Sequence, residues 1–339
     1  MRWLKWIGGI LIAVIVTGTG VGFWLMHDRP SLQPYADMLM PVAAVASGDV
    51  QIKFLGVATI LIEDGETAIL TDGFFSRPGI AQMLSGKIAP DIAAIEQGLK
   101  RAGINKLNAL IPVHSHYDHA IDAPEVAKRT GALLIGSEST ANIGRGWGLP
   151  ESQIRAAFIG EPMQFGRFTV TLLPSRHAPT GFTGGEITSP LKPPAGVTDY
   201  LEGASYAILI RHGDKSLLIN GSAGFEPGAL KDIRADVVML GTGGIGNFGE
   251  QHENTYWNEV VKSVGAKRVI AIHWDDFMTV AAGEPMAPAS WLLAKLLLGD
   301  FDQMIRQIKQ YGERDQIDVR LPLDGQPMNV WGGLEKARR

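Results

Sequence analysis

The order of strand-like and helix-like segments predicts an α/β protein with two sets of strands. The first set consists of short apolar runs bounded by turn residues, and Glu63-Asp64-Gly65 supplies a tight turn between two of them. Helical patterns then alternate with further strands, and a second set of strands follows. The predicted strands are residues 51–55, 59–62, 67–71, 107–113, 168–173, 206–211, 216–219, 237–240 and 268–272, and the predicted helices are residues 92–102, 123–128 and 256–264.

The composition excludes several classes of protein. The chain has 339 residues, which permits a large core in one or two domains. Hydrophobic residues make up 45% and charged residues 19%, a balance typical of a folded enzyme and not of a disordered chain. The net charge of -4 gives no indication of a nucleic-acid partner. Because the chain has no cysteine, any metal would depend on histidine and carboxylate ligands.

An apolar segment near the N-terminus predicts a membrane anchor. Residues 6–26 carry no charge and, at ~1.5 Å per residue in a helix, are long enough to cross a ~30 Å hydrocarbon core. Arg2 and Lys5 precede the segment, which favours a cytoplasmic N-terminus and a periplasmic or otherwise extracytoplasmic location for the remainder. The alternative is a cleaved signal peptide, for which residues 44–46 have the small-x-small form of a cleavage site.

Three histidines and an aspartate are concentrated in one short stretch. The apolar run 107–113 predicts a buried strand, and it is followed directly by His114, His116, Asp118 and His119. Residues two apart in an extended chain point the same way, so the first two histidines can face one centre. Neutral imidazole and carboxylate are ligands that hold zinc or iron. A lone buried histidine is usually a hydrogen-bonded core residue, but burying this many polar groups without a partner is costly, so the stretch predicts a metal site.

The spacing His-x-His-x-Asp-His resembles the signature of the metallo-β-lactamase-fold hydrolases. Other positions match the family in order: Asp72 ends a strand as the family's first acidic position does, while His177 and His273 match its later metal histidines. The resemblance covers residues 50–275 and implies an αββα sandwich, preceded here by one transmembrane helix. Together with the apolar N-terminal segment, this gives an expected layout of an anchor or signal segment, a linker and a hydrolase domain, at residues 1–27, 28–48 and 49–339.

Within this family, residues 55–59 and 72–75 look closest to the lactonase and N-acylphosphatidylethanolamine phospholipase D-like branch. The resemblance also implies two adjacent metal sites, with zinc as the expected metal, bound as one or two ions, and another divalent metal as the alternative. Asp118 would additionally orient the attacking water as the catalytic residue, and Asp72 would brace the metal-binding loop. The implied ligands are His114, His116 and His177 for one site, and Asp118, His119 and His273 for the other.

One position departs from the family pattern. Where the family has Gly-Asp-Thr-Gly, with the aspartate bridging two metals, this chain has Gly221-Ser222-Ala223-Gly224. Ser222 remains an additional candidate ligand, but a neutral hydroxyl bridges two cations less well than a carboxylate does. We therefore expect the second site to bind its metal more weakly than the first.

Three further segments have a functional and a plainer interpretation. Residues 244–249 satisfy G-x-G-x-x-G, a motif typical of dinucleotide-binding loops. However, the next strand ends in His273 instead of the acidic residue expected about 20 positions on, and the predicted helix starts late. We therefore interpret the loop as a glycine-rich rim near the metals. We expect Asp275 to orient a metal ligand, with two solvated loop acids, Asp275 and Asp276, as the alternative. Residues 178–203, rich in glycine and proline, predict a lid over the site.

These observations predict a membrane-anchored, metal-dependent hydrolase that acts on an ester, a lactone or a phosphodiester. The metal would lower the pKa of a bound water toward ~7 and polarise the substrate oxygen. Its partners would be a small-molecule or lipid substrate and the membrane, with no nucleic acid. The alternative is a non-catalytic metal-binding envelope protein that retains the fold, and Ser222 is the feature that favours it.

Overall fold

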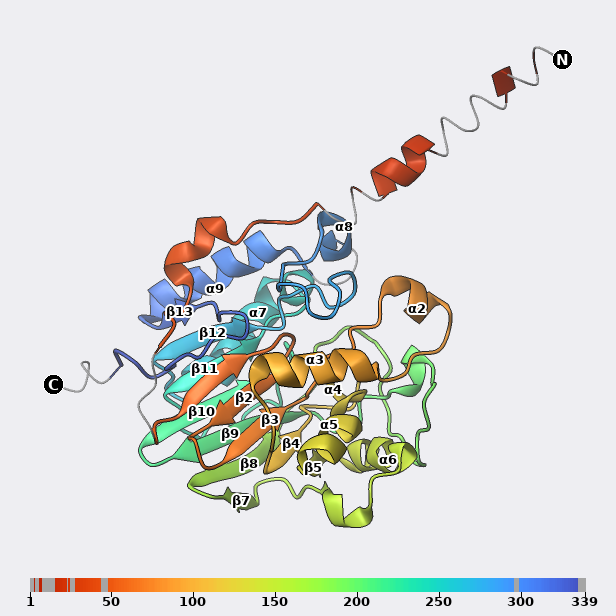
Figure 1. The fold of residues 1–339 in the computed structure, drawn as a ribbon. Helices are drawn as coiled ribbons and strands as arrows, with labels where there is room; N and C mark the ends of the chain where they lie inside the picture. Colours follow the sequence, from red (N-terminus) through yellow and green to blue (C-terminus); the bar gives the residue numbers. More distant parts are fainter. Residues whose placement is uncertain are drawn as a thin grey trace.

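Two mixed β-sheets lie face to face, and helices cover the outer side of each (Figure 1). The computed structural model describes residues 3, 6, 7, 16–22, 24, 28–43, 48–295 and 299–334. The largest hydrophobic cluster lies between the two sheets, and a second cluster lies between the first sheet and its helices. The predicted sandwich of two mixed sheets is therefore confirmed.

The first sheet has six strands in the order of the sequence. The pairs formed by its first three strands are antiparallel, and the remaining pairs are parallel. Side chains alternate between layers: Ile60 and Ile62 belong to the core between the sheets, whereas Leu61 belongs to the cluster under the helices. The strands are β1 (Gln51–Phe54), β2 (Ile60–Glu63), β3 (Ala68–Thr71), β4 (Ala109–Ile111), β5 (Leu133–Gly136) and β6 (Ile154–Ala156).

The second sheet has seven strands in the reverse order of the sequence, with antiparallel pairs from β7 to β10 and parallel pairs from β10 to β13. Every residue of β11 and β12 is buried, as is typical of parallel strands covered on both faces. The strands are β7 (Pro162–Phe165), β8 (Phe168–Pro174), β9 (Tyr206–His212), β10 (Lys215–Asn220), β11 (Val237–Gly241), β12 (Arg268–Ile272) and β13 (Asp318–Arg320).

Amphipathic helices close the outer faces of both sheets. On the first sheet, Leu99 of α3 and Val126 of α5 pack in one cluster with Leu110 of β4. On the second sheet, Trp257 of α7 and Ile305 of α9 join the central core. The helices are α2 (Ile80–Leu84), α3 (Ile92–Ala102), α4 (Tyr117–Ala120), α5 (Ala123–Thr130), α6 (Glu138–Trp147), α7 (Glu250–Trp257), α8 (Trp291–Leu293) and α9 (Phe301–Asp315), with 3-10 turns at Gln33–Met38, Glu151–Gln153, Val197–Asp199 and Ile245–Asn247.

The helix expected at residues 256–264 begins earlier than predicted. α7 starts at Glu250, directly after Gly249, and a π turn at Asn258–Lys262 continues it. The start is missed because the first residues of α7 are polar, so the apolar pattern begins only at Tyr256. The argument against nucleotide binding at residues 244–249 that relied on a late helix start is therefore wrong. The other argument holds, because β12 leads into His273 and not into an acidic residue.

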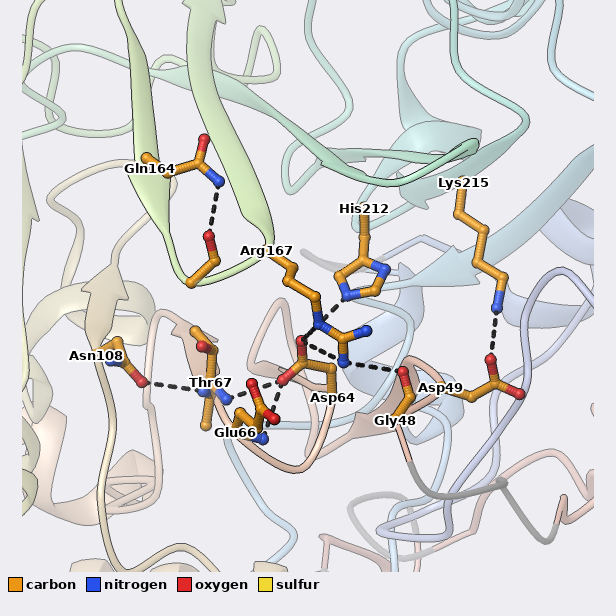
Figure 2. A network of polar contacts seen from close by, with 12 residues as sticks. Gly48, Asp49, Asp64, Glu66, Thr67, Asn108, Gln164, Arg167, His212 and Lys215 are labelled. Atoms are coloured by element: carbon orange, nitrogen blue, oxygen red, sulfur yellow. Dashed lines mark hydrogen bonds and ion pairs between the residues drawn. The ribbon is translucent and has the colours of Figure 1, made fainter.

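A polar network ties the two sheets together at the end of the sandwich where β3 begins (Figure 2). The carboxylate of Asp64, in the turn between β2 and β3, accepts hydrogen bonds from the backbone N–H groups of Glu66 and Thr67 at 3.0 and 2.8 Å. The same carboxylate lies 3.0 Å from His212 Nε2 and accepts from Arg167 Nε at 3.1 Å, and both of these residues belong to the second sheet's strands and turns. This buried aspartate thus joins the two sheets at one end of β3, whereas Asp72 lies at the other end.

The N-terminal segment contacts the domain from residue 28 onward. Met38 and Met40 are buried, and Leu39 forms a β-bridge with Leu321, so the described part of the predicted linker is packed against the body. Among the described residues, no helix is both long and apolar enough to cross a membrane. The predicted anchor at residues 6–26 lies partly outside the described residues and stays a prediction.

Candidate metal centre

The predicted ligands meet at one edge of the sandwich because they follow the ends of similarly directed strands. In the first sheet, β3 and β4 are parallel, and Asp72 and His114 come shortly after their ends. In the second sheet, β8 and β12 run in the same direction, and His177 and His273 follow them. Strand direction therefore brings residues more than 100 positions apart to a common edge.

The described residues contain two groups of three possible metal ligands. Within each group, one ligand atom from each residue lies within 4.8 Å of those of the other two. The two groups are adjacent, since the ring centroids of His114 and His119 are 4.0 Å apart. In the second group, Asp118 Oδ2 lies 3.5 Å from His119 Nε2 and 3.4 Å from His273 Nε2. The groups are His114, His116 and His177, and Asp118, His119 and His273, the same two sets that the resemblance implies.

The donor atoms of these groups fit a metal. His114 is almost completely buried, and within the described part of the chain neither of its ring nitrogens has a hydrogen-bond partner. His119 Nε2 and His273 Nδ1 are likewise buried without a partner. Buried polar atoms nearly always have a partner, so a cluster of unpartnered imidazole nitrogens is the arrangement that a cation would complete.

Asp72 holds one of these rings in place. Its Oδ2 lies 2.7 Å from His119 Nδ1, and its Oδ1 accepts a hydrogen bond from the backbone N–H of Val113 at 2.9 Å. The residue is fully buried and has a φ of +52°, in the left-handed region that aspartate adopts more readily than most residues. A histidine that donates from Nδ1 keeps Nε2 free for a metal, which is the supporting role predicted for Asp72.

Backbone carbonyls orient two rings of the first group. His177 Nδ1 lies 2.8 Å from the carbonyl oxygen of Ala178, and His116 Nε2 lies 3.2 Å from that of Thr183. Each contact occupies one ring nitrogen and leaves the other for a metal. Both carbonyls come from the segment that follows β8, so this segment is part of the metal centre.

Burial and the neighbouring rings favour the neutral form of the first group's histidines. Burial, together with nearby His119 and other rings, lowers the pKa of His114 well below 6.5, and burial with His116 lowers the pKa of His177 to about 4. Burial acts to raise the pKa of Asp118, but His119 and His273 beside it hold that pKa well below its ordinary value. Neutral imidazoles and an ionised carboxylate are the protonation states that bind metal.

Asp275 supports His273 through a neighbouring loop. Its Oδ1 accepts a hydrogen bond from the backbone N–H of Val57 at 2.8 Å, and its Oδ2 forms an ion pair with Arg77 at 2.6 Å. The carbonyl oxygen of Val57 in turn accepts a hydrogen bond from the backbone N–H of His273 at 2.8 Å, so Val57 links the two residues. Val57 and His273 both have positive φ, at 53° and 58°. This conformation is strained for a β-branched residue such as Val57, and it persists only where surrounding contacts enforce it.

The two acids after His273 are therefore not solvated. Asp275 is 1% exposed and Asp276 is fully buried, so the alternative of two solvated loop acids is wrong. Asp276 pairs with Arg29 at 2.7 Å, which links the N-terminal segment to the loop after β12. Arg29 and Arg77 lie about 200 positions or more away in the sequence, and no local pattern indicates either contact.

Two residues near the centre were missed by sequence reasoning. Asp122 is buried and accepts hydrogen bonds from the N–H groups of Phe75 and Ser76 at 2.7 and 2.6 Å, which ties the loop after Asp72 to the segment that carries the ligands. Burial raises its pKa to about 6, although the hydrogen bonds from Ser76 and Phe75 act to lower it. Gly243 is required by His273, because a Cβ there would lie 2.8 Å from His273 Nδ1. The carboxylate of Asp122 in an otherwise apolar stretch was the available signal.

A pocket of about 360 Å³ opens beside both groups and is lined by His116, Asp118, His177 and His273 among others. Ser222 also lines it, and its Oγ accepts a hydrogen bond from the N–H of Ala178 at 2.9 Å, so its position next to His177 is structural as well as suited to a ligand. The predicted lid is divided. Ala178, Thr180, Gly181 and Phe182 line the pocket, whereas later residues of the segment, such as Ile187 and Tyr200, are buried in a hydrophobic cluster.

Residues 52–193 match the model of the Metallo-beta-lactamase superfamily. Two similar proteins are named UPF0173 metal-dependent hydrolase. The one from Carboxydothermus hydrogenoformans is 26% identical over 237 residues, which is 68% of this chain and 88% of that protein. The one from Heliobacterium modesticaldum is 24% identical over 237 residues, which is 68% of this chain and 84% of that protein.

The metallo-beta-lactamase fold protein YhfI from Bacillus subtilis has a similar structure, with a TM-score of 0.51 and 14% identity over 83% of this chain and 100% of that chain. At this identity the similarity concerns the fold alone. The matched residues 52–193 include Asp72, the motif at residues 114–119 and His177. Residues 52–193 thus resemble the Metallo-beta-lactamase superfamily in sequence, and the chain shares the fold of YhfI.

Proposed function

We propose that this protein is a metal-dependent hydrolase that uses a metal-activated water to cleave an ester, a lactone or a phosphodiester. The observation that carries the proposal is the convergence of two ligand groups, with buried imidazole nitrogens that have no partner, beside an open pocket. The names of the similar proteins, metal-dependent hydrolases, support it.

The chain's own residues have distinct tasks in this proposal. Three histidines hold the first metal, and the second group holds a further metal if one binds, with zinc as the metal we propose. A divalent metal bound there lowers the pKa of water toward ~7 and polarises the substrate oxygen. Asp118, ionised and at the pocket wall, accepts a hydrogen bond from the attacking water and orients it. Asp72 keeps the proton of His119 on Nδ1.

The finer parts of the proposal rest on two features of the sequence. The charge-free run at residues 6–26, preceded by Arg2 and Lys5, supports a membrane anchor that holds the domain outside the cytoplasm, with the membrane and a small-molecule or lipid substrate as partners. Residues 55–59 and 72–75 support the lactonase and N-acylphosphatidylethanolamine phospholipase D-like branch.

The test is a substrate panel with zinc-loaded protein. Ester, lactone and phosphodiester substrates are assayed with the unmodified protein, with Asp118→Asn, and with Asp64→Asn, a buried aspartate in the polar network at the other end of β3 (Figure 2). We expect hydrolysis of at least one class, a loss of at least about 100-fold in Asp118→Asn, and normal rates in Asp64→Asn. Equal activity in all three proteins would contradict the proposal.

A second candidate is a non-catalytic metal-binding envelope protein. Ser222 favours it, because the hydroxyl replaces the carboxylate that would bridge two metals. Under this alternative the protein binds zinc at the first group but hydrolyses no member of the panel, so metal analysis and the substrate panel together separate the two functions.

A further inference from the structure

Apart from the proposed ligands, the lining of the pocket beside the metal centre is mostly apolar. Its other walls include the aromatic rings of Tyr117, Phe182 and Phe277 and the thioether of Met278. The remaining polar side-chain groups in the described lining are the hydroxyls of Tyr117, Thr180 and Ser222, and the Ser222 hydroxyl already accepts a hydrogen bond from a backbone N–H. A volume of about 360 Å³ is that of a small-molecule site.

Among the described residues that line this pocket, none is a lysine or an arginine. The arginines attached to its surrounding loops are committed to acids: Arg77 to Asp275 at 2.6 Å and Arg29 to Asp276 at 2.7 Å. Arg176, next to His177, pairs with Glu226 on the surface. Away from the proposed metals, an anionic group in this pocket would meet no side-chain cation among the described lining residues, and a buried charge without a partner is costly.

Two aromatic side chains flank the centre, one beside each ligand group. The ring of Phe182 meets the ring of His116 edge to face, with centroids 5.3 Å apart. The ring of Phe277 meets that of His273 in the same manner at 5.4 Å. A substrate atom held at the metals would therefore have an apolar surface on both sides, and Phe182, which is 40% exposed, forms the outer one.

From these contacts we infer that the substrate is an uncharged carboxylic ester, open-chain or cyclic, with an apolar group next to the scissile bond that packs on Phe182. The inference rests on the proposed hydrolytic function and narrows its substrate class. In the reaction, the water oxygen forms a bond to the carbonyl carbon while the bond from that carbon to the alkoxy oxygen breaks. One water proton goes to the leaving alcohol, and the other is released as the product acid ionises.

The first test compares substrates that differ in one property. With zinc-loaded full-length protein, kcat/KM is measured for 4-nitrophenyl acetate, 4-nitrophenyl hexanoate and bis(4-nitrophenyl) phosphate. We expect the hexanoate to exceed the acetate by about tenfold, because its longer chain buries more apolar surface, and both esters to exceed the phosphodiester. A phosphodiester preferred over both esters, or equal values for the two esters, would overturn the inference while leaving the hydrolase function intact.

Phe182→Ala tests the position of the apolar group. The variant should raise KM for the hexanoate about tenfold with little change for the acetate, since only the longer chain reaches the ring. Phe158→Ala is the matched control, because Phe158 is an exposed phenylalanine (71%) that does not line the pocket. Zinc content is measured for both variants, since Phe182 touches His116. Equal effects of the two substitutions would contradict the assigned position.

Binding supplies a readout that does not need turnover. The ketone 1-(4-nitrophenyl)heptan-2-one is an uncharged analogue of the hexanoate that cannot be hydrolysed, and its binding is measured by calorimetry with metal-free and zinc-loaded protein. We expect binding that is weakened about tenfold by Phe182→Ala and unchanged by Phe158→Ala. If no ester is hydrolysed but the ketone binds in this way, the hydrolase proposal fails and the apolar pocket stands. If the ketone does not bind to either form of the protein, the pocket assignment fails.

Discussion

The contact between Asp72 and His119 allows the effect of one substitution to be worked out in detail. The Asp72 carboxylate is fully buried, with Oδ2 at 2.7 Å from His119 Nδ1 and Oδ1 accepting from the N–H of Val113 at 2.9 Å. Because an ionised carboxylate only accepts hydrogen bonds, His119 carries its proton on Nδ1 and presents a lone pair on Nε2. Asp72 therefore selects the tautomer that can bind a metal.

Asp72→Asn replaces one oxygen by an NH2 group at nearly constant size. Asparagine tolerates the φ of +52°, so the backbone should stay in place. Its oxygen can accept from Val113 only if the NH2 group faces His119, and this forces the His119 proton onto Nε2. Metal binding at Nε2 would then break one of these buried hydrogen bonds, which costs about 1–3 kcal/mol, and loss of such a support lowers metal affinity about 10–100-fold. We expect that fall only at the site that contains His119.

Zinc titration against a competing chelator measures the two binding steps, and a correlation spectrum of the ¹⁵N-labelled imidazoles identifies the nitrogen that carries the proton. Asp64→Asn is the matched control: Asp64 is also a buried aspartate that binds a histidine, His212 at 3.0 Å, and backbone N–H groups (Figure 2). It should lower stability without changing zinc affinity. Unchanged affinity at both steps in Asp72→Asn, or the same loss in the control, would refute the reasoning.

Four further outcomes are expected. His116→Ala should abolish hydrolysis and release zinc, and full metal content with normal activity would contradict the site. Unmodified protein should hold about one tightly bound zinc and Ser222→Asp about two, because dications ~3.5–4 Å apart repel without a bridging anion; two equally tight sites in a titration of the unmodified protein would disprove this. Burial raises the pKa of Asp122 from 3.8 to about 6, so the native state binds this proton more tightly than the unfolded state does. The protein should therefore lose up to about 3 kcal/mol of its free energy of unfolding as pH rises from about 4 to about 7. In urea unfolding at pH 4.5 and 7, Asp122→Asn should lack this loss, and the same pH dependence in the variant and the unmodified protein would contradict the prediction. The protein should fractionate with membranes, and a reporter fused after Arg339 that works only in the cytoplasm would contradict the orientation.

Local patterns in the sequence determine the class of the fold and the candidate ligands. Strands with alternating burial, such as β2 with Ile60, Leu61 and Ile62, can be predicted because the alternation is a property of neighbouring residues. The helix Ile92–Ala102 matches its prediction, since Asp91 caps its start and Gly103 ends it in the left-handed conformation. α9 is not among the predicted helices, although Asp300 caps its start and is a local signal for it.

The motif at residues 114–119 indicates a metal site because its spacing is local, but the tertiary structure decides how its ligands are held. Asp275 reaches His273 through Val57, and Arg77 completes that contact from nearly 200 positions away. Likewise, the pocket has an apolar surface beside the ligands because Phe182 and Phe277, which belong to separate loops, both line it. A sequence specifies which side chains are available and how neighbours along the chain are spaced. Which side chains lose water together, and which nitrogen of each histidine is left for a metal, depends on contacts between distant segments that form only when the two sheets pack.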